Sequence, residues 1–236
     1  MRFHIVTIFP EAFESYMRES IIGRALRNKV ISVKFYNPRD FIKSKNKNNY
    51  RPVDNRPYGG GPGMIMRSEP VLKAVEKAIP KIKNKKKILI INFIPSAEKF
   101  TTGEAKKISE KYTDIILICG RYEGIDARVD KILQQSQNKF LKFKQLSIGD
   151  YVLTGGEIPA MILVDCVSRQ IEGVLGNFDS REEERVSSSE VYTRPEILKW
   201  KGKNYKVPKI LLSGNHGKIE NWKKSRKGKI YGKYKK

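Results

Sequence analysis

The sequence has few of the residues that build metal centres, disulfide frameworks or membrane spans. It contains two cysteines and two histidines among 236 residues, too few for a disulfide scaffold, and it shows no metal-ligand motif. Cys119 and Cys166 stand far apart in apolar runs, so we expect two free, buried thiols. No apolar run approaches the roughly 18 residues of a membrane helix, and no repeat is found. We therefore expect a cytoplasmic protein without a membrane partner, and we expect the opening MRFHIVTIF to be a strand rather than a secretory leader.

Acidic residues are also scarce. The chain has 25 Asp and Glu against 48 Lys and Arg, a formal net charge of +23. Such an excess favours a polyanionic partner, above all nucleic acid. Basic residues gather at 43–51, 81–87 and 223–236, and Tyr231 and Tyr234 interleave with the last group. Aromatic residues among lysines can stack on bases, although such a tail can equally be a solubilising extension.

Apolar patterning predicts strands alternating with helices through about residue 172. The runs at 87–94 and 114–120 are almost continuously apolar, as in central parallel strands covered on both faces. The sequence therefore predicts an α/β domain with a mostly parallel sheet over 1–172, a polar linker over 173–190 and a small basic domain over 191–236. The remaining predicted elements are strands at 2–9 and 30–36 and helices at 11–28, 68–79, 101–112, 125–135, 157–171 and 217–227.

Three glycine-rich stretches are candidate sites. RPYGGGPGM (56–64) lets backbone approach a flat or charged ligand closely. It lacks the Gly-Lys-Ser/Thr of a phosphate-binding loop, and a flexible loop is the alternative. ICGRYEGID (118–126) follows a strand and precedes a helix, the usual place of a ligand in α/β sheets. It does not match the dinucleotide pattern, and a plain turn with a surface Arg–Glu pair is the alternative.

The third stretch is LSIGDYVLTGGE (146–157), which breaks at Gly149 and again at Gly155-Gly156 around strand-like residues 151–153. It predicts either a hairpin or helix start, or a pocket whose walls are backbone groups. Because the second and third stretches both end strand-like segments of one sheet, both can face one cavity. Exposed amides and carbonyls there can read an adenine edge.

Six motifs in order carry a resemblance: RPYGGGPGM, GRYEGID, SIGDYVLTGGE, GVLGN, YTRP and VPKILLSGNH. Over nearly the whole chain the sequence resembles the bacterial tRNA (guanine-N1)-methyltransferase family of the SPOUT class. The resemblance implies an α/β domain with a deep trefoil knot, a small helical C-terminal domain and an intertwined homodimer. It implies methyl transfer from S-adenosylmethionine to N1 of the guanosine immediately 3′ of the anticodon, with the anticodon arm of tRNA as partner. Mg²⁺ is expected from the resemblance alone.

The resemblance also assigns residues. Arg169 matches a catalytic arginine. Glu123 matches a glutamate close to the bound ligands. The glycine-rich loop at 58–63 is expected near the target guanine and the dimer interface. The expected cofactor residues are Pro95, Gly120, Glu123, Gly124, Ile148, Gly149, Asp150, Tyr151, Val152, Leu153, Gly155 and Gly156, and the expected substrate residues are Tyr58, Gly59, Gly60, Gly61, Ser213 and Asn215.

Two positions depart from the family pattern. The family uses an aspartate base in the linker, and counting from the matched Gly-Asn places Glu184 there, with Glu183 and Asp179 as alternatives. In the first cofactor strand Pro95 matches but its neighbours in NFIPSAEKF differ. A non-catalytic RNA-binding protein and a SPOUT methyltransferase acting on another RNA therefore stay open as alternatives, although the C-terminal motifs argue against the second.

Overall fold

The computed structural model describes the backbone of residues 1–44, 51–79, 87–176 and 190–231. The chain divides into two compact units, Met1–Gly176 and Asn177–Lys236. Asp179, Glu183 and Glu184, most of the basic cluster at 81–87 and the last five residues fall outside the described ranges.

The first unit is built on a five-stranded sheet in the order β2-β1-β6-β5-β7, in which every pairing is parallel. This confirms the predicted parallel α/β fold. The strands are β1 (Arg2–Val6), β2 (Ser32–Tyr36), β5 (Ile88–Phe93), β6 (Asp114–Ile118) and β7 (Leu141–Leu146). Strand β7 was not predicted. It is an edge strand, so its sequence LKFKQL alternates between buried and exposed residues instead of forming an apolar run.

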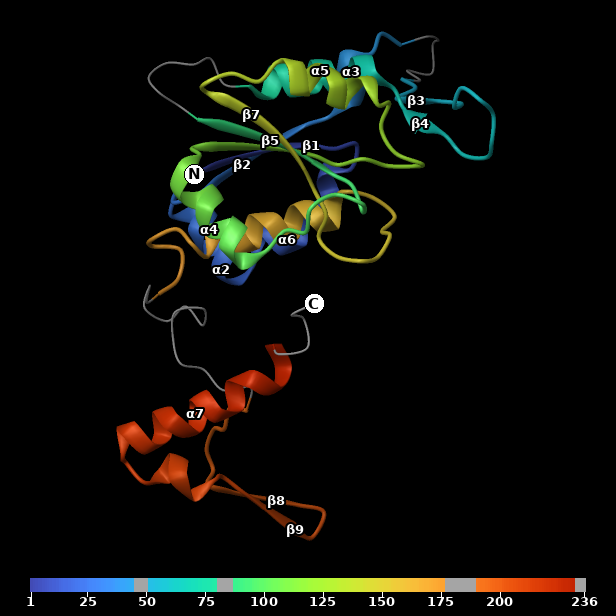
Figure 1. The fold of residues 1–236 in the computed structure, drawn as a ribbon. Coiled ribbons are helices and arrows are strands. Elements are labelled where there is room, and N and C mark those ends of the chain that lie inside the picture. The colour runs from blue at the N-terminus through green and yellow to red at the C-terminus, as the bar shows by residue number, and fades with distance from the viewer. Residues whose placement is uncertain (45–50, 80–86, 177–189, 232–236) are drawn as a thin grey trace. The chain divides into compact units, whose positions relative to one another are not determined.

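Helices cover both faces of the sheet (Figure 1). Side chains alternate between the faces of a strand, so Ile88 and Ile90 join one apolar core while Leu89 and Ile91 join the other, all fully buried. The central strands are thus covered on both sides, as predicted. One face carries α3 (Ser68–Ala78) and α5 (Arg128–Gln135), and the other carries α2 (Ser20–Arg27), α4 (Thr102–Lys111) and α6 (Glu157–Ser168).

The single helix predicted over 11–28 is wrong. The segment forms η1 (Pro10–Phe13), α1 (Glu14–Arg18) and α2, and the chain breaks at Ser20, whose φ is 49°. A Cβ on Gly23 would lie 2.2 Å from the carbonyl oxygen of Arg18. The apolar spacing runs through the break, so it could not reveal the kink that this glycine permits.

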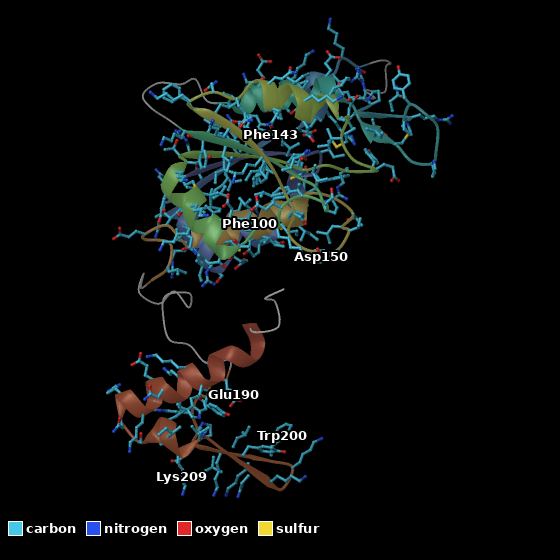
Figure 2. All side chains as sticks on the ribbon, in the orientation of Figure 1. Phe100, Phe143, Asp150, Glu190, Trp200 and Lys209 are labelled. Atoms are coloured by element: carbon cyan, nitrogen blue, oxygen red, sulfur yellow. The ribbon has the colours of Figure 1, made fainter. Side chains whose placement is uncertain are left out.

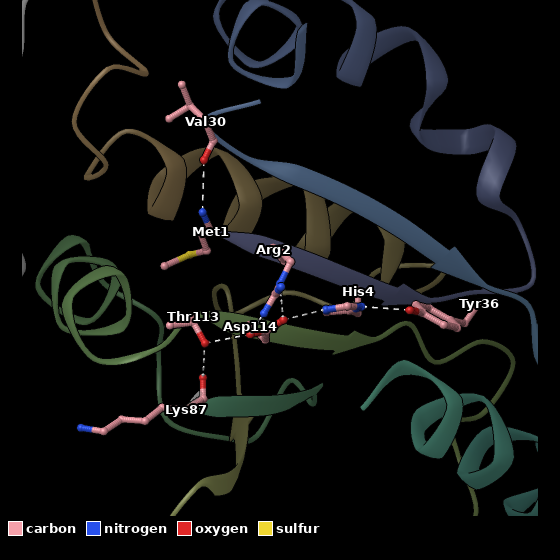
Figure 3. A network of polar contacts seen from close by, with 8 residues as sticks. All are labelled: Met1, Arg2, His4, Val30, Tyr36, Lys87, Thr113 and Asp114. Carbon is pink, nitrogen blue, oxygen red and sulfur yellow. Dashed lines mark hydrogen bonds and ion pairs between the residues drawn. The ribbon is translucent and has the colours of Figure 1, made fainter. Parts of the chain in front are cut away.

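A polar network ties β1, β2 and β6 together (Figure 3). The buried carboxylate of Asp114 accepts two bonds of 2.6 Å from Arg2 and one of 2.7 Å from Thr113 Oγ1. His4 lies between Asp114 (3.1 Å) and the hydroxyl of Tyr36 (3.0 Å). Burial would raise the pKa of Asp114, but these hydrogen bonds hold that pKa below 3.8. Burial lowers the pKa of His4 below 6.5, against the pull of Asp114.

The second unit combines a hairpin with helices. The strands β8 (Ile197–Trp200) and β9 (Lys203–Lys206) pair antiparallel. They are followed by η4 (Lys209–Leu212) and by α7 (His216–Tyr231), which covers the helix predicted at 217–227. The hairpin was not predicted, because its lysine-rich sequence has no clear alternation of apolar residues. None of the helices in the described ranges has the length and apolar character that crossing a bilayer requires.

Candidate functional site

A cavity of about 310 Å³ lies where β5, β6 and β7 end. Ligands of open α/β sheets bind at the carboxyl ends of the strands, so this is the expected edge for a site. Three segments form most of its wall: 92–95 at the end of β5, 120–125 after β6, and most of 146–156 from the end of β7.

The structure brings nearly all of the expected cofactor residues to this cavity. The exception is Asp150, labelled in Figure 2, which does not line the cavity. Its carboxylate lies 2.5 Å from Nζ of Lys99. Residues 151–153 form a loop rather than the strand-like segment predicted, because the sheet already ends at Leu146. The lining residues among those expected are Pro95, Gly120, Glu123, Gly124, Ile148, Gly149, Tyr151, Val152, Leu153, Gly155 and Gly156.

The loop that closes the cavity leaves backbone groups open. Among the described residues, no hydrogen bond uses the backbone N–H or C=O of Tyr151, Val152 or Leu153. Earlier in the loop, Ser147 Oγ and the backbone of Gly149 bond to each other at 3.0 and 3.2 Å. Backbone donors and acceptors without an internal partner need another one. At a cavity wall they suit a flat ligand with polar edges.

A partly buried ion pair joins the wall segment after β6 to the start of α6. Nε of Arg121 lies 2.9 Å from Oε2 of Glu157, at an angle too poor for a hydrogen bond. The carboxylate is 3% exposed, and its other oxygen accepts a 2.8 Å bond from Oγ1 of Thr7. The guanidinium of Arg121 also lies 4.6 Å from the centre of the Phe9 ring, a cation–π contact. The segment after β6 is thereby tied to the start of α6 and to the chain after β1.

The glycine pair has a packing reason. The amide of Gly156 donates a 2.9 Å bond to the carbonyl of Gly120. A Cβ on Gly156 would lie 2.6 Å from Cα of Cys119, and a Cβ on Gly155 would lie 2.5 Å from Nε of Arg121. The second and third glycine-rich stretches meet here with no room for a side chain.

The first glycine-rich stretch joins the same wall. It lies between β3 (Asp54–Asn55) and β4 (Ile65–Met66). The amide of Met66 donates to the carbonyl of Gly124 at 2.9 Å, and the amide of Glu123 donates to the carbonyl of Met64 at 3.0 Å. Gly63 has a φ of 88°, and a Cβ there would lie 2.5 Å from the Glu123 side chain.

The tip of this loop stands clear of the rest of the described chain. Tyr58 is fully exposed, and Gly59, Gly60 and Gly61 all have φ between 80° and 104°. No described atom lies within 4 Å of a Cβ built on any of these three glycines. The loop therefore has a base fixed to the cavity wall and an open tip.

Asn92 and Asp130 are among the lining residues that the sequence did not single out. Nδ2 of Asn92 donates to both carboxylate oxygens of Asp130, at 2.9 and 3.1 Å, and Gln145 donates to Asp130 at 2.7 Å. The signal was present, because Asn92 is the one polar residue of the strand Ile88–Phe93 and is 5% exposed. In the ranges that the structure describes, no group of three or more His, Cys, Asp or Glu side chains could hold a metal ion.

The other expected site residues lie outside the cavity wall. Arg169 is half-buried at the end of α6, where its amide donates to the carbonyl of Asp165. In the second unit Asn215 caps α7 by accepting a 3.0 Å bond from the amide of Lys218, and Ser213 Oγ donates to the carbonyl of Ile210. These contacts are local, so the roles of the three residues stay predictions, as does that of Glu184.

Comparison with known proteins places the chain in a family. The sequence model described as tRNA (Guanine-1)-methyltransferase TrmD matches residues 1–235. The chain is 41% identical to a tRNA (guanine-N(1)-)-methyltransferase of Buchnera aphidicola, over 94% of this chain and 87% of the relative. It is 43% identical to one of Clostridioides difficile, over 95% of this chain and 91% of the relative. The chain therefore belongs to the tRNA (guanine-1)-methyltransferase family.

Proposed function

We propose that this chain transfers a methyl group from S-adenosylmethionine to N1 of the guanosine immediately 3′ of the tRNA anticodon. The observation that carries the proposal is the cavity beyond β5, β6 and β7, whose wall contains the glycine-rich motifs at 120–124 and 148–156. Family membership supports the guanine of tRNA as substrate. The net charge of +23 supports a polyanionic partner.

The cavity fits the cofactor. The open backbone groups of residues 151–153 match the polar edge of adenine, and the glycines at 120, 155 and 156 keep the wall free of side chains. When bound, S-adenosylmethionine supplies a methyl group that is already electrophilic. The protein's task is then to align the two reactants.

The target nitrogen must lose its proton, so the reaction needs a base. We assign that role to Glu184 in the linker, with Glu183 and Asp179 as the alternatives. Arg169 is proposed to stabilise the charge that develops towards O6. Glu184→Gln is expected to lower kcat by on the order of 10²–10⁴-fold, while Glu183→Gln and Asp179→Asn stay near the wild type. Near wild-type turnover of Glu184→Gln would remove that assignment.

Family membership supports the remaining features of the proposal. We propose a knotted SPOUT domain over 1–172, a linker over 173–190, a tRNA-binding domain over 191–236, a homodimer and a cytoplasmic setting. Lysine and arginine contacts to phosphate would make tRNA affinity fall steeply with salt. Mg²⁺ is expected from the family alone, because the described residues contain no group of three or more His, Cys, Asp or Glu side chains that could hold it.

Methyl transfer to two transcripts tests the proposal. One tRNA transcript carries guanosine directly after the anticodon, and the other carries adenosine there. Label from S-adenosylmethionine is expected on the first only. Label on both transcripts would place the target elsewhere, and label on neither, with Mg²⁺ present, would favour an RNA-binding protein without this activity.

A further inference from the structure

The hairpin β8–β9 presents an exposed ribbon that no other described element of the second unit covers. All eight of its strand residues are exposed. The turn residues Lys201 and Gly202 both have positive φ, 47° and 75°, as tight two-residue hairpin turns require. The register therefore fixes which side chains share a face.

One face of the ribbon is aromatic. Leu198 pairs with Tyr205, and Trp200 pairs with Lys203. Residues directly opposite each other in an antiparallel pair point to the same side, so these four side chains share one face. Trp200 is 61% exposed and Tyr205 is 54% exposed, and Figure 2 shows Trp200 on this hairpin. Large aromatic side chains left in water mark a contact surface.

The charge of the ribbon selects the partner. Residues 197–206, ILKWKGKNYK, contain four lysines and no carboxylate. A second copy of the same ribbon would bring like charges together. Cations beside exposed aromatic faces suit unpaired nucleotides, whose bases stack while their phosphates are neutralised. Paired RNA keeps its bases stacked in the helix and is read mainly by shape and backbone.

We propose that this face, Leu198, Trp200, Lys203 and Tyr205, binds unpaired nucleotides of the RNA substrate. Trp200 and Tyr205 stack on bases, and Lys203 contacts phosphate. The proposal rests on the proposed function and adds to it a surface in the second unit.

Fluorescence tests the stacking directly. The chain has two tryptophans, Trp200 and Trp222, so Trp222→Phe leaves Trp200 as the reporter. Saturable quenching is expected on titration with the tRNA transcript, and none with a fully paired RNA of equal length. Trp200→Ala is expected to bind tRNA about tenfold more weakly or worse, with unchanged affinity for S-adenosylmethionine. Ile197→Ala, on the opposite face, is the matched control and should bind tRNA as the wild type does.

The outcomes separate this surface from the activity itself. If the wild-type protein methylates tRNA and Trp200→Ala binds tRNA with wild-type affinity, the proposed binding surface is wrong and the proposed activity stands. If the wild-type protein does not methylate tRNA, the proposed activity is wrong, whatever the tRNA affinity of the hairpin variants. If sedimentation gives Trp200→Ala a lower mass than the wild-type protein, the ribbon is a contact between copies of the chain. That result would also overturn the proposal.

Discussion

Gly156→Ala tests how closely the two motif segments of the cavity wall must meet. The added Cβ would lie 2.6 Å from Cα of Cys119, 2.9 Å from the amide nitrogen of Gly120 and 3.1 Å from the carbonyl carbon of Cys119. All three neighbours are backbone atoms, so no side chain can rotate away. The strand end and the helix start must separate, and the 2.9 Å bond from Gly156 to Gly120 must lengthen or break.

The expected effect is large enough to measure. Overpacking of this kind costs about 1–3 kcal/mol, and each kcal/mol lowers Tm by roughly 2–4 °C in a unit of this size. Because both displaced segments line the cavity, we expect the Kd for S-adenosylmethionine to rise by about tenfold or more, equivalent to ~1.4 kcal/mol. Calorimetric titration gives the Kd, and thermal unfolding gives the Tm.

Gly103→Ala is the matched control. A Cβ on Gly103 would find only Thr101 Oγ1, at 3.8 Å, and the residue lies in α4. Alanine is favoured over glycine in a helix by up to about 1 kcal/mol, so this variant should be as stable as the wild type or more stable, with unchanged cofactor affinity. A Gly156→Ala protein with wild-type Tm and wild-type Kd would refute the packing argument for the site.

Three further predictions concern the ion pair, the polar network and the open loop. Glu157→Gln leaves the guanidinium of Arg121 without its charged partner. Urea titration should therefore show a free energy of unfolding lower by about 1–3 kcal/mol. Glu110→Gln, on the exposed face of α4, is the control and should leave this free energy unchanged. Burial lowers the pKa of His4 below 6.5, so the folded state disfavours protonation of this imidazole. The free energy of unfolding should therefore fall as pH drops below 6.5. His4→Gln should flatten this part of the pH profile of stability, and an unchanged profile would contradict the role given to His4. The alanine of Gly60→Ala would meet no neighbouring atom but would have to hold a φ of 80°. This variant should raise the KM for tRNA with little change in the Kd for the cofactor. Equal effects on both constants would place the loop tip at the cofactor instead.

The sequence predicted the parts of the fold that depend on local pattern. Runs such as ILIINF and DIILI are almost continuously apolar, as expected of central strands covered on both faces, and the structure places both inside the parallel sheet. Strand β7 and hairpin β8–β9 were not predicted from the sequence. One is an edge strand and the other is a solvent-exposed ribbon, so neither needs apolar runs.

The cavity was predicted only in outline. That two glycine breaks end strands of the same sheet could be foreseen, but which side chains fill the space between them could not. Asn92 reaches Asp130, 38 residues away, and Glu157 reaches Thr7, 150 residues away. Such pairs are set by the meeting of distant elements, and no spacing along the chain encodes them.

The most direct test of the account is a crystal structure of this chain grown with S-adenosylhomocysteine, the product form of the cofactor. We expect its adenine against the backbone of residues 151–153 and its amino-acid part towards Glu123, inside the wall formed by 92–95, 120–125 and 146–156. Density for the product at any other place on the chain would contradict the assignment of this cavity and, with it, the mechanism built on it.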